Sequence, residues 1–193
     1  MNGSVSKLDV FALSLIAALI YYLSYRSAHQ ISALYEFSHS TSWFYLPSGV
    51  RLLLVLILME SGALGVILGT LAIDYLFNLS MNHLYNWVTA IIAGTSAYLS
   101  LRLAQRLFKL KTDLSSLNQR QLFGICVVFS VISPLMHQFW YALDGDTLDF
   151  WPSLAVMTLG DLGGSVVLLG ALYWRSEEHT SELQSQSTIS YAV

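Results

Sequence analysis

Several stretches of this chain stay apolar for roughly 18 residues or more, the length that crosses a bilayer core of about 30 Å. Because lipid offers no water to exposed backbone groups, such stretches must close their hydrogen bonds internally as helices. The composition agrees, since 55% of the 193 residues are hydrophobic and only 11% are charged. A transmembrane barrel would instead need short segments of alternating apolar and polar residues. The sequence therefore predicts an all-α, polytopic transmembrane helix bundle.

About six spans are expected, and the first is interpreted as a retained helix rather than a cleaved signal. They run from about Leu8 to Tyr25, Phe44 to Met59, Gly62 to Phe77, Asn86 to Phe108, Arg120 to Leu143 and Trp151 to Trp174. Spans two and three follow each other directly. Whether they form two full spans or one re-entrant hairpin stays open at this point.

The charges of the short loops predict the orientation of the spans. Basic residues gather at or near the linker between spans four and five, namely Arg102, Arg106, Lys109, Lys111 and Arg120. The loop between spans five and six carries Asp144, Asp146 and Asp149 and no Lys or Arg. Loops rich in Lys and Arg stay in the cytoplasm. The basic linker and both termini are therefore expected in the cytoplasm, and the acidic loop outside.

The last part of the chain, residues 175–193, changes abruptly to polar sequence. It resembles the in-frame translation of a common sequencing adapter, which favours a non-native tail beginning at residue 175 or 176. The alternative is a polar cytoplasmic tail. We therefore divide the chain into an integral membrane domain, residues 1–174, and a tail, residues 175–193.

Ionisable residues inside spans are candidates for function, because each one is costly in lipid unless it finds a partner. Four stand out: Arg51, Asp74, His137 and Asp161. At 1.5 Å of rise per residue, the first three lie about 6–9 Å below the outer helix ends and Asp161 about 15 Å. We expect Arg51 to pair with Asp74 or Asp161. The group either lines an outward-opening ligand pocket or forms a structural charge network that fixes the helices.

A helix break precedes this arginine. Pro47, Ser48 and Gly49 are expected to leave free backbone groups at the start of span two, which suits an anion or a carboxylate. Glycines in span three and around Asp161 in span six predict close helix contact. A contact between spans three and six would bring both aspartates towards Arg51.

Enzyme signatures are absent from the sequence, so no catalytic residue and no cofactor are predicted. His29 and His39 are two histidines ten residues apart, too few for a metal prediction. No patch is basic enough for nucleic acid.

Two motifs together resemble membrane-associated sensor (MASE-type) domains. Residues 44–53, followed by Gly65 and Gly69, resemble the W-x-P-x-x-G start and glycine-bearing next helix of that family, and residues 159–164 resemble its late G-D-x-x-G helix. The resemblance implies a bacterial signal-input module of the plasma (inner) membrane, usually fused to a cytoplasmic kinase or cyclic-dinucleotide enzyme. This chain has fewer spans than that family usually has.

The functional prediction is thus a sensory membrane module with an outer-leaflet polar pocket. A small transporter or transporter subunit, and a structural membrane subunit, are the alternatives. The expected partners are the lipid bilayer, a cytoplasmic output domain or partner protein, and a second copy of the chain in a homo-oligomer.

Overall fold

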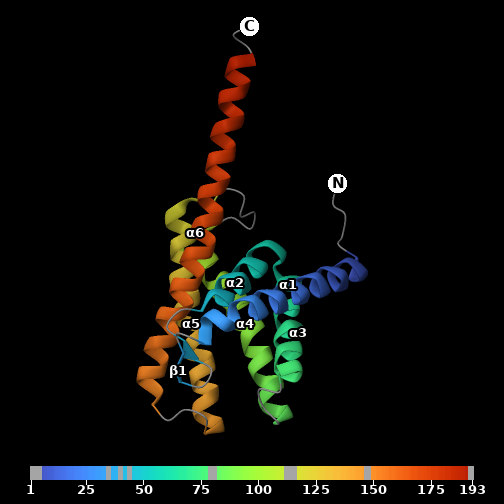
Figure 1. The fold of residues 1–193 in the computed structure, drawn as a ribbon, viewed down its shortest axis with the longest axis vertical. Coiled ribbons are helices and arrows are strands. Elements are labelled where there is room, and N and C mark those ends of the chain that lie inside the picture. Colours follow the sequence, from blue (N-terminus) through green and yellow to red (C-terminus); the bar gives the residue numbers. More distant parts are fainter. Residues whose placement is uncertain are drawn as a thin grey trace.

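The structure, a computed structural model, describes residues 6–33, 36–38, 41–42, 45–77, 82–110, 117–145 and 149–190, with side chains for 6–28, 45–77, 82–110, 117–145, 149–175 and 178. The side chains of His29, His39, Trp43 and Phe44 lie outside this part. The helices are α1 (Lys7–Ala33), α2 (Leu46–Leu58), α3 (Glu60–Phe77), α4 (His83–Leu107), α5 (Gln119–Asp144) and α6 (Phe150–Ser190) (Figure 1). A short antiparallel hairpin, β1 (Glu36–Ser38) and β2 (Thr41–Ser42), lies between α1 and α2. The predicted helical bundle is confirmed.

Five of these helices are long and apolar enough to cross a membrane, and α2 is not one of them. Its 13 residues extend about 20 Å, against a bilayer core of about 30 Å. A single residue, Met59, with a φ of 53°, separates α2 from α3. The second predicted span is therefore a short helix that turns back at once into a full span.

Local sequence explains where two of the long helices begin. The Asn82 side chain accepts hydrogen bonds from the backbone amides of Leu84 and Tyr85, at 3.0 and 3.3 Å. Asn118 and Gln121 form a reciprocal capping box at the start of α5. Because the first amides of a helix have no partner within the helix, these caps fix the starts of α4 and α5.

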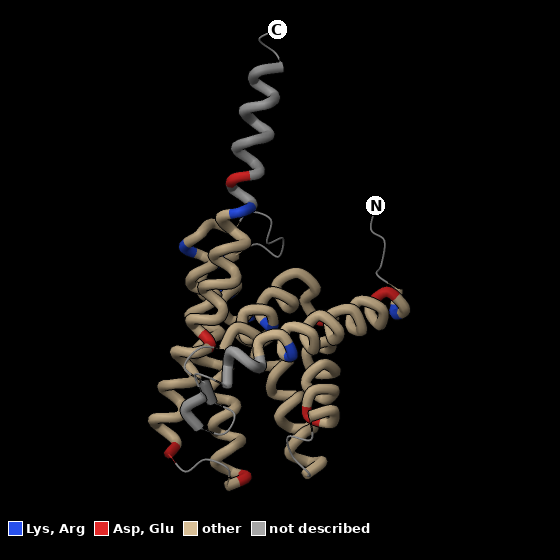
Figure 2. Tube along the Cα trace, viewed as in Figure 1, with Lys and Arg blue, Asp and Glu red and all other residues tan. Residues whose placement is uncertain are grey.

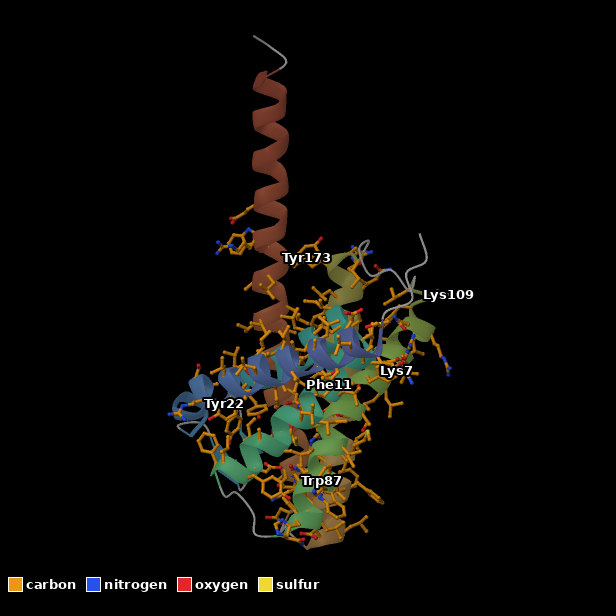
Figure 3. All side chains as sticks on the ribbon, turned by 90° about the vertical axis from the view of Figure 1, so that its right-hand side faces the viewer. Lys7, Phe11, Tyr22, Trp87, Lys109 and Tyr173 are labelled. Atoms are coloured by element: carbon orange, nitrogen blue, oxygen red, sulfur yellow. The ribbon has the colours of Figure 1, made fainter. Side chains whose placement is uncertain are left out.

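Helix α1 crosses the bundle obliquely instead of running alongside α4, α5 and α6, as Figures 1 and 3 both show. It packs on α3, where a side chain on Gly65 would overlap Ala17 and one on Gly69 would press on Ala18. Small residues permit this close crossing. The glycines of α3 face α1 and, at Gly62, Leu54 of α2. They therefore do not make the contact of spans three and six that would have brought both aspartates towards Arg51.

The charges next to the α4–α5 linker and those next to the α5–α6 loop lie at opposite ends of the bundle (Figure 2). The α4–α5 linker follows Arg102 and Arg106 and precedes Arg120, whereas Asp144 and Asp149 flank the α5–α6 loop at the opposite end. This placement agrees with the charge asymmetry from which the orientation was predicted. The orientation itself stays a prediction.

Candidate functional site

The start of α2 is fastened to the middle of α6. The Tyr45 backbone amide donates to the Gly160 carbonyl at 3.3 Å, and the Ser48 hydroxyl donates to the carbonyls of Tyr45 at 2.7 Å and Asp161 at 3.3 Å. Pro47 occupies the first turn, where a missing amide proton costs nothing. The helix break therefore makes hydrogen bonds to the chain's own backbone.

Two glycines let these helices touch. A Cβ on Gly49 would lie 2.5 Å from the Gly164 carbonyl oxygen, and a Cβ on Gly164 would overlap the Tyr45 carbonyl oxygen. Pro47, Ser48 and Gly49 are all buried. The free backbone groups expected at this break thus face α6 at contact distance, which leaves no space for an anion between Gly49 and Gly164.

The depth of this contact differs from the prediction. Gly160 lies ten residues beyond Phe150, where α6 begins, which places it about 15 Å along that helix. Since Tyr45 bonds Gly160, α2 starts near the middle of the span and not at its outer boundary. Arg51 accordingly lies level with Asp161 and not in a separate layer above it.

Arg51 and Asp161 form a buried ion pair (Nη2 to Oδ2, 3.3 Å), with side chains 3% and 1% exposed. The guanidinium carbon of Arg51 also lies 5.2 Å from the ring centroid of Phe129 on α5, which adds a cation–π contact. The ion-pair distance is long, since charge-assisted bonds of this kind measure about 2.7–2.9 Å. Of the two predicted partners of Arg51, Asp74 and Asp161, the structure therefore shows Asp161 as the one that forms the ion pair.

This pair leaves hydrogen-bonding capacity unused. Arg51 Nε and Asp161 Oδ1 are buried and have no hydrogen-bond partner in the described part of the chain, and the same holds for Ser133 Oγ. The Ser133 and Ser48 hydroxyls both lie close to the Asp161 carboxylate, although neither Ser133 Oγ nor Asp161 Oδ1 meets the geometry of a hydrogen bond. Because Nε and Nη2 share one edge of a guanidinium, a small rotation would allow a bidentate pair.

His137 lies on α5, one turn beyond Ser133, and is 3% exposed. Its Nδ1 is 2.8 Å from the Ser133 carbonyl oxygen; a carbonyl only accepts, so Nδ1 carries a proton. Arg51 lies within electrostatic range of the ring. Towards the α5–α6 loop, His137 meets the edge of Tyr141, whose ring stacks on Tyr85 of α4 at 5.9 Å.

Asp74 stands apart from this group. It is 8% exposed, and α3, which carries it, packs against α1, α2 and α4. Its Oδ2 atom has no hydrogen-bond partner among the described residues, like Thr70 Oγ1 one turn earlier. The ion pairs between described side chains are Arg51–Asp161 and Arg102–Glu60, so Asp74 belongs to neither.

Phe129 and Ser133 belong to the site although the sequence did not single them out. With His137 they form an i, i+4, i+8 row, which places all three on one face of α5. That spacing was the available signal, but in a membrane helix apolar and small residues occur on every face. The row therefore becomes informative only once the partner helix is known.

The chemistry of the group is electrostatic. It supplies one cation, one carboxylate, one imidazole and hydroxyls in a buried setting, and the described residues hold no cluster of three side chains that could ligate a metal. Fold and site together define a polytopic α-helical membrane protein whose short second helix is tied to its last helix by a buried ion pair. Comparison with known protein families, curated proteins and solved structures found no match.

Proposed function

We propose that residues 1–174 form a sensory, signal-input module of the plasma membrane. The observation that carries the proposal is the buried pair of Arg51 and Asp161, which links α2 to the last helix of the bundle. A stimulus that displaces α2 would act on α6 through this pair. The end of α6 lies on the side of the basic linker (Figure 1), the predicted cytoplasmic side, where an output domain or partner protein would receive the signal.

The unused atoms of the pair support a switching role. A ligand can shift a protein only between states that it binds differently. The single 3.3 Å contact and the unpartnered Arg51 Nε and Asp161 Oδ1 are compatible with a second, bidentate state. The resemblance to MASE-type domains, carried by residues 44–53 and 159–164, points to the same role.

The experiment fuses residues 1–174 to a cytoplasmic cyclic-dinucleotide synthase and measures its product at equal membrane abundance. Arg51→Ala and Asp161→Asn are each expected to change the output severalfold, because each uncouples α2 from α6. Gly170→Ala is the control, since nothing lies within 4 Å of a Cβ at that position. Unchanged output in folded, inserted Arg51 and Asp161 variants would contradict the sensory role and favour a structural one.

A small transporter is the second candidate, and the depth of α2 favours it. A helix that begins near mid-membrane beside ionisable residues is a feature of transporter binding sites. Flux across proteoliposomes, measured with a pH-sensitive dye for protons, distinguishes the candidates. Proton flux that Asp161→Asn abolishes would support transport. An absence of flux, together with a fusion protein whose output changes in the Arg51 and Asp161 variants, would support sensing.

The genomic sequence beyond codon 174 gives an independent test. It shows whether an output domain follows α6 in frame or whether the protein is a short stand-alone relative. Genomic DNA that encodes residues 175–193 without adapter would overturn the interpretation of this tail.

A further inference from the structure

In the described part of the chain, three basic residues at the linker end of α4 and α5 form no ion pair. Arg106, Lys109 and Arg120 are exposed, and no ion pair between described residues includes them. Arg102 differs, because it donates to the Tyr98 hydroxyl at 3.0 and 2.7 Å and lies 3.8 Å from Glu60. We call Arg106, Lys109 and Arg120 the basic triad.

Lys109 occupies a backbone conformation that favours glycine. Its φ is 50°, and the next amide, Leu110, donates back to the Gln105 carbonyl at 2.9 Å, which closes the end of α4. Glycine is the usual residue at this position because a Cβ is disfavoured there. A strained residue is a reason to look for a use of its side chain, and here the side chain supplies a cation (Figure 3).

Packing brings the two helix ends together. A Cβ on Gly124 of α5 would lie 2.8 Å from the ring of Phe108, so this ring lies directly on α5. Lys109 follows Phe108 in the chain, and Arg120 precedes Gly124 by one helical turn, on the same face. The end of α4, which carries Lys109, therefore lies beside the first turns of α5, which carry Arg120.

Apolar side chains adjoin this charge. Leu103 and Leu107 on α4 and Phe123 on α5 are 40%, 60% and 53% exposed. Leu103 and Phe123 lie further from the linker than Arg106 and Arg120, and therefore on the membrane side of these charges. Leu107 lies between Arg106 and Lys109. A ligand that fills both parts has an anionic head and apolar chains.

We propose that the basic triad and this apolar face bind an anionic phospholipid. Membrane surfaces with anionic lipids attract basic residues with about 1 kcal/mol each, or roughly fivefold in affinity. The site is separate from Arg51 and Asp161 and is independent of the proposed sensory function. It predicts that the chain selects lipids by headgroup charge on the side of the α4–α5 linker.

The test uses the full chain in a neutral detergent, titrated with phosphatidylglycerol or phosphatidylcholine of identical acyl chains and followed by native mass spectrometry. Phosphatidylglycerol is expected to bind and phosphatidylcholine to bind at least tenfold more weakly. Each of three single variants should weaken the binding of phosphatidylglycerol about fivefold, namely Arg106→Gln, Lys109→Gln and Arg120→Gln. Arg26→Gln, which removes the same charge on α1, is the control and should leave binding unchanged.

Lys109→Gly gives the sharpest variant, because two readouts should move in opposite directions. The melting temperature without lipid should rise, since glycine relieves the backbone strain, while phosphatidylglycerol binding falls. Equal binding of both lipids, or unchanged phosphatidylglycerol binding in Lys109→Gly, would overturn the proposal. Equal stabilisation by inorganic phosphate at the same phosphate concentration would also overturn it, because it would identify a free-anion site.

Discussion

At the scale of single residues, two buried aspartates in the same membrane domain have opposite surroundings. Asp161 faces Arg51 at 3.3 Å, whereas Asp74 Oδ2 has no hydrogen-bond partner among the described residues. Removing one member of a buried ion pair leaves the other charge uncompensated, and removing an unpaired carboxylate does not. The chemical type of these residues is identical, so only their neighbours distinguish their roles.

Arg51→Ala is therefore expected to lower the free energy of unfolding by about 3–5 kcal/mol, measured by titration with sodium dodecyl sulfate in mixed micelles. Asp161→Asn should cost a comparable amount, because it strands the guanidinium. Asp74→Asn is the matched control and should leave stability unchanged or raise it. The free energy of unfolding would contradict this expectation if it fell by less than about 1 kcal/mol in both pair variants, which is the range of an exposed ion pair. The pair would then not stabilise the contact between α2 and α6.

At the scale of elements, contact between α2 and α6 positions the site. Gly164→Ala is expected to cost about 1–3 kcal/mol by overpacking and to disturb the Tyr45–Gly160 hydrogen bond, because the new methyl group would overlap the Tyr45 carbonyl. The same titration checks the loss, with Gly170→Ala as the exposed control on the same helix. Equal stability of both variants would mean that α2 is not seated on Gly164.

The helices themselves could be predicted from sequence, since the expected spans of α3, α4 and α5 differ from the observed helices by only a few residues at their ends, and α6 begins one residue before its expected start. Helix α6 continues to Ser190, beyond the expected end at Trp174. The length of an apolar stretch depends only on consecutive residues, so it can be read directly from the sequence. The partner of Arg51 could not be predicted in this way. Glycines indicate that a backbone comes close but not which one, and those of α3 face α1 and α2.

The depth of α2 was missed for a related reason. Trp43, Phe44 and Tyr45 have the composition of an interfacial anchor, which placed the start of the helix at the outer boundary. The Tyr45–Gly160 bond places it about 15 Å along α6 instead. Aromatic residues suit both an interface and a protein interior, so this signal cannot decide between them.

At the scale of the whole molecule, the separation of charge (Figure 2) predicts the sidedness of the chain. With Cys126 replaced by alanine, Lys109→Cys should resist a membrane-impermeant maleimide in intact cells, and Asp149→Cys should react. The physical reason is that basic loops are retained in the cytoplasm. Permeabilised cells provide the control, because both cysteines should react there. If Lys109→Cys alone were labelled in intact cells, the orientation of the bundle in the membrane would be the opposite of the predicted one.

The chain separation of the ion pair has a consequence for biosynthesis. Asp161 follows Arg51 by 110 residues, so at about 5–20 residues per second the ribosome needs roughly 5–20 s to supply the partner. During that interval the arginine must stay close to water or within the insertion machinery. A chain that stops before α6 would keep an uncompensated cation in its membrane domain, which is costly in lipid. The ion pair can therefore form only after the last helix has been synthesised.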